Sequence, residues 1–457
     1  MNVLIISAIL GVVMMFTGIL LKSKAAVRNA AVTGMGLLLL LNILEMYGTR
    51  LFEANIYGMI YFDRFALLFN TVAVFSTFVY LLLSARDMEK TGINYAEYFA
   101  LLFFIICGIT LISSFKSLLI LFLGIEIISI PLYILTGSDK RNLKGNEASL
   151  KYFLLGAFST GLMLMGIAMV YGVMGSFSST IRLGEGQGPN ALLIGGILLL
   201  LFSMSFKASL APFHFWTPDV YDGAPTVFTS FMATVVKAAV FIAFIRLFGD
   251  GFGILHPQWQ LMVALITVAT LFIGNITAVF QQSVKRMLAY SSIAQAGFMM
   301  LALFAMNTEA KEGLLLYTVA YSFATIGIFA VLIKMNDYTF SGFNGFAKHQ
   351  PLLAATTTIF LLSLAGIPLT AGFLSKFYML KATLASGKTL WLVIFAVLMA
   401  AISVYYYFRV IQAMYFKEGE DPKIQAGPAF KCTLVFLAAA IILLGIFPNL
   451  LLNWMYF

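Results

Sequence analysis

Long, uninterrupted apolar runs constrain this chain more than any other feature of its sequence. Of its 457 residues, 61% are hydrophobic and only 10% are charged. The apolar residues gather in runs of about 18 or more, which is the length of a helix that crosses a bilayer. Open sheets cannot span lipid, and barrel strands alternate in polarity, so these runs predict an all-α membrane bundle.

The apolar runs predict about fourteen transmembrane helices. They cover residues 3–21, 27–47, 64–85, 95–114, 117–136, 148–174, 191–215, 226–248, 260–281, 285–306, 312–334, 351–385, 389–415 and 432–455. The polar stretches between the runs are too short for a soluble domain. Residues 1–457 are therefore predicted to form a single membrane domain, and the first run is predicted to be a retained helix because no basic segment precedes it.

The basic residues divide unevenly between the two sides of such a bundle. Loops on one side carry Lys22, Lys24, Arg28, Arg86, Lys90, Lys140, Arg141, Lys144, Arg286, Lys348, Lys417, Lys423 and Lys431. Loops on the other side carry scattered charges such as Arg50, Lys116, Arg182, Lys311 and Lys388. The positive-inside rule makes the first side cytoplasmic and predicts that both termini lie outside. The net charge of +9 is explained by this asymmetry, and no nucleic-acid partner is predicted.

Two spans are interrupted in the same way. In the seventh, Lys207 precedes Pro212 and the polar string TPDVYDGAP; in the twelfth, the string AGIP at Ala365–Pro368 precedes Lys376. Paired breaks of this kind mark transporters built from inverted repeats. Because the breaks are five spans apart, we expect two inverted five-helix repeats. They would cover 95–248 and 260–415, with flanking helices in 1–94 and 416–457. The alternative is that both prolines only kink packed helices.

Three lysines lie deep inside apolar spans: Lys207, Lys237 and Lys376. A cation near the bilayer centre costs about 2.5–3.5 kcal/mol even on the insertion scale that penalises it least. A low-dielectric environment disfavours the charged form of an amine, so a buried lysine can gain and lose a proton near neutral pH. These lysines are therefore predicted to carry protons.

Four further residues are candidates for the same chemistry. Glu126 lies well inside its span, where a carboxylate needs a partner or a proton. Lys151 either snorkels to the headgroups or pairs with Glu126 and gates proton release. His214 lies two helical turns beyond Lys207, across the Pro212 break, and is either a relay partner or a structural histidine. Lys285, at a helix start, is by position an interfacial charge rather than a relay.

No metal or cofactor site is predicted. The only cysteines, Cys107 and Cys432, are far apart and form no CxxC pair. They support neither a disulfide framework nor an iron–sulfur cluster.

Five sequence strings resemble the antiporter-like membrane subunits of respiratory complex I, the NADH–quinone oxidoreductase, and most closely those of the N type. They are GIEIISIPLYIL at Gly124–Leu135, EASLKYFLLGA at Glu147–Ala157, FKASLAPFHFWTPDVYDGAP at Phe206–Pro225, VKRMLAYSSIAQAGF at Val284–Phe298 and SLAGIPLTAGFLSKFY at Ser363–Tyr378. The resemblance covers essentially the whole chain. It implies fourteen helices, two inverted five-helix repeats, and breaks in the seventh and twelfth helices.

The resemblance also implies a role in proton translocation for seven residues. They are Glu126, Lys151, Lys207, His214, Lys237, Lys285 and Lys376. Related subunits can carry glutamate at the last position, so Lys376 favours the N type. Where family members often have SSISHLGY, this chain has SSIAQAGF, with Gln295 in place of the histidine. A histidine relay on the tenth helix is therefore not expected.

By this resemblance the chain is a proton-translocating subunit of an NADH–quinone oxidoreductase in the bacterial inner membrane, with no redox site of its own. FMN, iron–sulfur clusters, NADH and quinone are expected in partner subunits of the complex. Glu126 and Lys151 would tune Lys207, which would pass protons through water and Lys237 toward Lys376. The alternatives are a subunit of a multisubunit sodium/proton antiporter, a related ferredoxin-linked or hydrogenase complex, or a structural scaffold.

Overall fold

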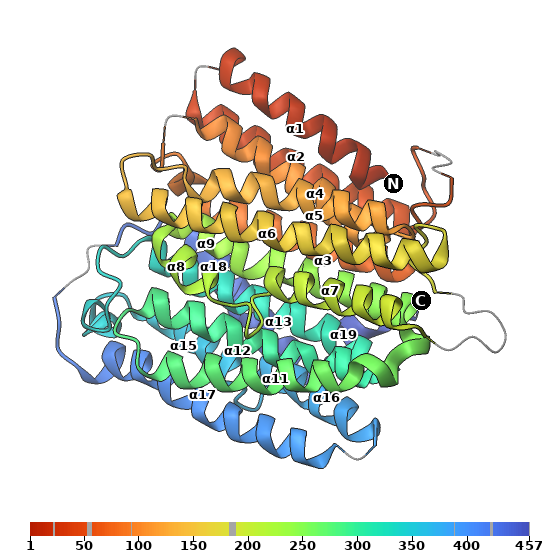
Figure 1. The fold of residues 1–457 in the computed structure, drawn as a ribbon. Coiled ribbons are helices and arrows are strands. Elements are labelled where there is room, and N and C mark those ends of the chain that lie inside the picture. The colour runs from red at the N-terminus through yellow and green to blue at the C-terminus, as the bar shows by residue number, and fades with distance from the viewer. Residues whose placement is uncertain are drawn as a thin grey trace. The chain divides into compact units, whose positions relative to one another are not determined.

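The computed structural model describes residues 1–21, 23–52, 57–92, 94–181, 189–387, 389–420 and 424–456. Lys22, Arg182, Lys388 and Lys423, which contribute to the predicted charge asymmetry, lie outside the described residues. Within these ranges the regular structure is helical, and β-pairing is limited to isolated bridges. The predicted all-α fold is confirmed (Figure 1).

The α-helices have the following bounds: α1 Asn2–Leu20, α2 Lys24–Met46, α3 Arg64–Met88, α4 Tyr95–Ser114, α5 Leu118–Thr136, α6 Leu143–Met174, α7 Ala191–Lys207, α8 Trp216–Gly223, α9 Thr226–Phe231, α10 Lys237–Phe244, α11 His256–Val279, α12 Val284–Ala305, α13 Thr308–Ile333, α14 Phe346–His349, α15 Pro351–Ala365, α16 Ala371–Ala385, α17 Leu390–Phe416, α18 Pro428–Ile446 and α19 Asn449–Leu452. Two π-helical segments, Met232–Val236 and Ile245–Gly251, flank α10 and join it to α9 in one long span.

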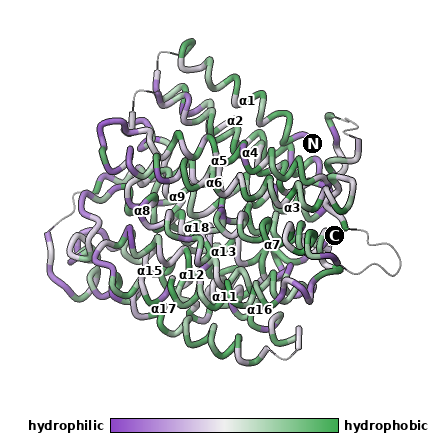
Figure 2. The backbone as a smooth tube through the Cα atoms, in the orientation of Figure 1, coloured by the Kyte–Doolittle hydropathy of each residue, from purple (hydrophilic) through white to green (hydrophobic). Residues whose placement is uncertain are grey.

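Among the described residues, 12 helical spans are long and apolar enough to cross a membrane. The seventh and twelfth predicted spans are not in this set, because they begin with the shorter apolar helices α7 and α15. Adding these two gives the predicted fourteen. Figure 2 shows that the helices are mostly hydrophobic and that hydrophilic residues gather in the connections between them. The chain is thus a multi-pass membrane protein.

Both predicted breaks are confirmed, and each has a local cause. Helix α7 ends at Lys207, and Ser209 then adopts a positive φ of 63° that no α-helix can continue. Helix α15 ends at Ala365, and Gly366 follows with a φ of 84°, a conformation that glycine adopts at little cost. The Thr370 hydroxyl then accepts a hydrogen bond from the Phe373 N–H and caps the start of α16.

The chain divides into two compact units. The first contains Met1–Leu81, Met88–Ser209 and Val235–Val263, and the second contains Leu82–Asp87, Leu210–Thr234 and Ala264–Phe457. The boundaries of the predicted repeats, 95–248 and 260–415, stay a prediction.

In the first unit, helices α1, α4, α5, α6 and α7 pack in sequence, each against the next (Figure 1). Small residues allow the closest approaches between them, as is common where helices pack in lipid. A Cβ added to Gly166 of α6 would lie 2.8 Å from the carbonyl oxygen of Gly196 in α7. The α6–α7 contact therefore requires glycine at residue 166.

Replacing Gly166 by valine is expected to destabilise this contact by about 1–3 kcal/mol, because the added methyl groups force the two helices apart. The measurement is the thermal unfolding midpoint of the detergent-extracted complex. Gly161→Val is the matched control, since it lies in the same helix and a Cβ there would meet no atom within 4 Å. Equal midpoints for the two variants would contradict the packing described here.

In the second unit, α12 and α13 are buried along nearly their whole length. Helix α13 packs against α9, α12, α15, α16 and α18, and α12 also contacts α8, α16 and α17. The two halves of the broken twelfth span, α15 and α16, are thus held against the centre of this unit. This packing places the end of α15 and the middle of α16 among buried polar side chains of α12 and α13.

Candidate functional site

In the first unit, Lys207 lies at the centre of a cluster of hydroxyl groups. Its Nζ donates to Ser129 Oγ at 2.9 Å, to the Tyr133 hydroxyl at 3.3 Å and to Thr160 Oγ1 at 3.4 Å. The lysine occupies the last turn of α7, where the carbonyl end of the helix dipole favours a positive charge. Lys207 is therefore surrounded by polar groups that accept its hydrogen bonds.

Thr160 joins this lysine to the predicted carboxylate. The Thr160 hydroxyl donates to Glu126 Oε1 at 2.8 Å, so Glu126 and Lys207 are separated by one hydroxyl bridge. Glu126, Ser129 and Tyr133 follow one another at spacings of three and four residues in α5 and therefore share a helix face. Glu126 and Lys207 are both half-buried. The structure thus brings together two residues that lie 81 positions apart.

Lys151 is paired with a different carboxylate from the one expected. Its Nζ lies 2.7 Å from Glu147 Oε1, one helical turn earlier in α6. Both side chains are well exposed, at 42% for Lys151 and 64% for Glu147. The predicted Lys151–Glu126 pair stays a prediction, and in this conformation the lysine, two turns into α6, has a surface partner.

Lys237 is the first residue of α10 and is only 1% exposed. It follows directly after the π-helical segment Met232–Val236, a helix type that occurs frequently at functional sites. Helix α10 packs against α4 and α7 within the first unit. The prediction that Lys237 is buried is confirmed.

In the second unit, Lys376 is bound to the end of the first half of its own broken span. Its Nζ donates to the carbonyl oxygens of Leu364 at 2.8 Å and Ala365 at 3.1 Å, and it lies 4.7 Å from the centre of the Phe298 ring. The side chain is 6% exposed and its stem passes over Gly366, where a Cβ would lie 3.0 Å from Lys376 Cδ. Lys376 thus sits at the negative end of the α15 dipole.

A hydrogen-bonded side-chain network adjoins Lys376. Gln295 Nε2 donates to Leu364 O and to the Tyr407 hydroxyl, both at 3.0 Å, and Gln295 Oε1 accepts from the Tyr317 hydroxyl. Tyr407 in turn shares a hydrogen bond with Ser291. Gln295 and Lys376 therefore use the same carbonyl group, that of Leu364.

Lys285 and His214, the remaining candidates, also lie in the second unit. Lys285 is 3% exposed, and its Nζ donates to the carbonyls of Asp222 at 2.9 Å and Ala224 at 2.8 Å, at the end of α8. This contact makes it a buried cation at a helix terminus, and its expected interfacial position stays a prediction. His214 is buried, and its Nδ1 has no hydrogen-bond partner among the described residues.

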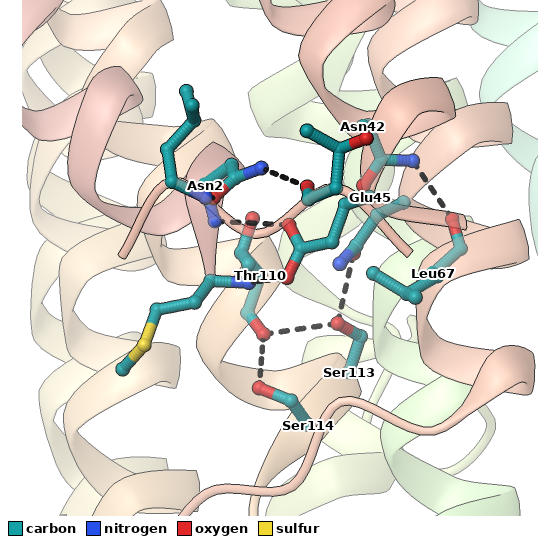
Figure 3. A network of polar contacts seen from close by, with 11 residues as sticks. Asn2, Asn42, Glu45, Leu67, Thr110, Ser113 and Ser114 are labelled. Atoms are coloured by element: carbon teal, nitrogen blue, oxygen red, sulfur yellow. Dashed lines mark hydrogen bonds and ion pairs between the residues drawn. The ribbon is translucent and has the colours of Figure 1, made fainter. Parts of the chain in front are cut away.

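Sequence reasoning missed a buried polar network in the first unit, which Figure 3 shows. Glu45, 5% exposed, accepts from the backbone N–H of Asn2 at 2.9 Å and pairs with the Met1 ammonium. Asn42 Nδ2 donates to Leu67 O at 2.9 Å, and the Ser113 hydroxyl contacts Thr110 O at 2.9 Å. The signal that could have revealed it is a carboxylate and an asparagine within the apolar run of α2.

Two buried ion pairs were also missed. Arg246 is 2% exposed and lies 2.6 Å from Asp63 in the first unit. Lys334 pairs with the buried Asp87 in the second unit. Both basic residues stand within or at the end of apolar runs, which is the same signal that marks Lys207, Lys237 and Lys376. By contrast, no cluster of His, Cys, Asp and Glu suited to a metal ion occurs within the described ranges.

Comparison with known proteins agrees with this geometry. The family model described as "NADH:quinone oxidoreductase/Mrp antiporter, TM" matches residues 116–403. NADH-quinone oxidoreductase subunit N of Cytophaga hutchinsonii is 40% identical over 87% of this chain and 88% of its own length. The corresponding protein of Trichlorobacter lovleyi is 39% identical over 86% of this chain and 82% of its own.

A solved structure extends the match to the whole fold. A chain of respiratory complex I from Thermus thermophilus superposes with a TM-score of 0.86 and 32% identity, covering 99% of this chain and 98% of that one. The chain therefore belongs to the NADH-quinone oxidoreductase subunit N proteins, within the NADH:quinone oxidoreductase/Mrp antiporter membrane family.

Proposed function

We propose that this chain moves protons across the membrane by way of Glu126, Lys151, Lys207, His214, Lys237, Lys285 and Lys376. It does so as a membrane subunit of an NADH–quinone oxidoreductase in the bacterial inner membrane, with both termini outside. The observation that supports this most is the single-hydroxyl bridge between Lys207 and Glu126. A base and an acid so connected in a low-dielectric surrounding influence each other's protonation.

In the first step, Glu126 controls whether Lys207 holds its proton. While Glu126 is charged, its field and the Thr160 bridge favour the ammonium form of Lys207. When Lys151 exchanges its partner Glu147 for Glu126, that field is neutralised and Lys207 releases its proton more readily. Movement of a single surface lysine would thereby be converted into proton transfer.

In the later steps of proton transfer, the groups that surround the carrier can hydrogen-bond to it whether it is charged or neutral. Lys376 is held by backbone carbonyls, which accept hydrogen bonds from an ammonium or from a neutral amine. Protons pass from Lys207 to Lys237 and on to Lys376, an order proposed from the sequence of the charged groups along the chain. His214 and Lys285, both in the second unit, are further candidates for proton transfer.

Water completes the route between these groups. The hydroxyls of Ser205 in the first unit, and of Thr217, Ser230 and Thr325 in the second, are buried without a hydrogen-bond partner in the described part of the chain. Buried polar groups of this kind normally bind ordered water. Such water can carry protons where side chains are too far apart for direct transfer.

The redox chemistry belongs to other subunits in this proposal. FMN, iron–sulfur clusters, NADH and quinone would bind to partner subunits, and this chain would respond to them through changes at its surface. A sodium/proton antiporter subunit is the main alternative. The two clusters are centred on amines, whereas a sodium ion would require a cage of oxygen ligands, so the geometry favours protons.

Replacing Lys376 by methionine tests this function. The change removes the charge and the proton while keeping an unbranched side chain. In the assembled complex reconstituted into liposomes, the share of protons per quinone reduced that this subunit carries is expected to fall by more than about half, because methionine cannot carry a proton. The control is Lys381→Met, an exposed lysine of the same helix that pairs with Glu309. Equal pumping by K376M and K381M would refute the proposal.

A further inference from the structure

We propose that Gln295 is a positioning residue that fixes the Leu364 carbonyl beside Lys376 and insulates this lysine from the hydroxyl groups of Tyr407 and Ser291. The inference rests on the proposed role of Lys376 as a proton carrier. It assigns a function to an amide that is buried beside this lysine.

The contacts of Gln295 fix the orientation of its amide. Leu364 O has no proton to give, so the atom of Gln295 that faces it must be the donor Nε2. The second hydrogen on Nε2 is then directed to the Tyr407 hydroxyl oxygen, and Oε1 accepts from Tyr317. Both donors and the acceptor are used, so the amide has a single satisfied arrangement.

This arrangement determines where Lys376 is held. Leu364 O accepts from Gln295 at 3.0 Å and from Lys376 Nζ at 2.8 Å. A carbonyl with two lone pairs accommodates both donors. Because Gln295 contacts it from α12, the unwound end of α15 cannot shift without breaking the Gln295 hydrogen bond. The position of the acceptor for Lys376 is thereby set from a helix that is buried along nearly its whole length.

The amide also interrupts a possible proton path. Ser291, Tyr407 and Gln295 form a continuous hydrogen-bonded series that ends at the carbonyl shared with Lys376. Hydroxyl groups can pass a proton along such a series, but an amide has no proton that titrates near neutral pH. The cavity lined by Gln295, Tyr317 and Lys376 is only about 10 Å³, which is at the lower limit for one water molecule. Gln295 therefore blocks transfer from Tyr407.

A histidine could not replace these functions without a change of charge. A neutral imidazole has one N–H, so it cannot donate both to Leu364 O and to Tyr407. It could accept from the Tyr407 hydroxyl instead, but the Tyr317 hydroxyl would then lose its acceptor. It could donate to both groups only by taking a second proton, which would put a cation beside the ammonium of Lys376. Gln295 supplies two donors with no charge at all.

The titratable groups near Gln295 are Tyr317 and Tyr321 of α13, Lys376 of α16, and Tyr406 and Tyr407 of α17. The carboxylates of α8, Asp219 and Asp222, pair with Arg286, nine residues before Gln295 in α12. Among these, Lys376 is the group whose charge is expected to alternate during turnover. An imidazole introduced here would therefore couple chiefly to Lys376.

The test compares Q295H and Q295M with the wild type in reconstituted complexes, measuring protons pumped per quinone reduced from about pH 5.5 to about pH 7.5. The protonated fraction of an imidazole falls from about nine-tenths at about pH 5.5 to about one-tenth at about pH 7.5. As the pH falls, the share of protons per quinone reduced that this subunit carries is therefore expected to decrease about threefold in Q295H relative to wild type. Q295M, which has no donor, should have a lower ratio that does not vary with pH. Gln281→His is the control, because Gln281 is half-buried outside the network and donates to Thr277 O.

A Q295H profile parallel to those of wild type and Q281H would overturn the inference, as would full pumping by Q295M. The ratio is measured on whatever complex assembles, so reduced yield does not obscure the result. K376M separates this inference from the proposed function. If K376M pumps normally, the carrier role of Lys376 fails; if K376M is impaired while Q295H and Q295M match wild type, only the role of Gln295 fails.

Discussion

Replacing Lys207 by methionine is expected to reduce quinone-driven proton pumping by the assembled complex more than any other single change in this chain. Lys207 makes three hydrogen bonds to hydroxyl groups and one bridged contact to Glu126. Methionine fills a similar volume but carries no proton, so the relay loses its first carrier. With one carrier absent, the number of protons that this subunit pumps per quinone reduced should fall by about tenfold. A factor of ten corresponds to about 1.4 kcal/mol in the barrier to transfer.

Lys144→Met is the matched control for this change, because Lys144 is exposed at the start of α6 and belongs to no proposed step. Liposomes with a pH-sensitive dye inside report pumping, and quinone reduction by the same sample reports electron transfer. Loss of pumping in both variants would indicate general damage. Normal pumping by K207M would show that Lys207 does not carry protons.

Replacing Glu126 by glutamine is expected to have the second largest effect. Glutamine keeps the size of the side chain, and its carbonyl oxygen can still accept from Thr160. The negative charge is lost, so the field that favours the ammonium form of Lys207 disappears and cannot be restored by exchange with Lys151. Pumping should fall severalfold, with the remaining activity exceeding that of K207M because the carrier itself is still present.

The control for Glu126 is Glu97→Gln, an exposed carboxylate in the first turn of α4. Pumping per quinone reduced is compared across E126Q, E97Q and the double variant E126Q/K207M. Because Glu126 acts through Lys207, the double variant should pump no less than K207M alone. A double variant clearly worse than K207M would mean that Glu126 supports a separate route.

The sequence predicted the elements of the fold well, since apolar length alone decides where a helix crosses lipid. The breaks after Lys207 and Ala365 were predicted from Pro212, Gly366 and Pro368. The predicted span 191–215 contains the first break, but the exact residue at which α7 ends was not predicted, because the positive φ of Ser209 leaves no signal in a pattern of apolar residues. Where these helices lie in space depends on close contacts such as Gly166 with Gly196, which periodicity does not specify.

The charged residues of the candidate site were predicted from the sequence, but its hydroxyl residues were not. A charge in an apolar run stands out, so Lys207, Lys237, Lys376 and Glu126 were found. Ser129, Tyr133 and Thr160 did not stand out, because hydroxyl residues also occur in ordinary helix packing. Their spacing from Glu126 along one face of α5 was a usable signal for two of them. The partner of Lys151 could not be predicted, since Glu147 and Glu126 are both acceptable to a flexible lysine.

The most direct test of the account is the pumping ratio of the double variant Lys207→Met/Lys376→Met, compared with that of the double control Lys144→Met/Lys381→Met. If both buried lysines carry protons along one route, the double variant should retain the same low ratio as the lower of its two single variants, while quinone reduction continues. A ratio equal to that of the control would contradict the claim that these amines translocate protons.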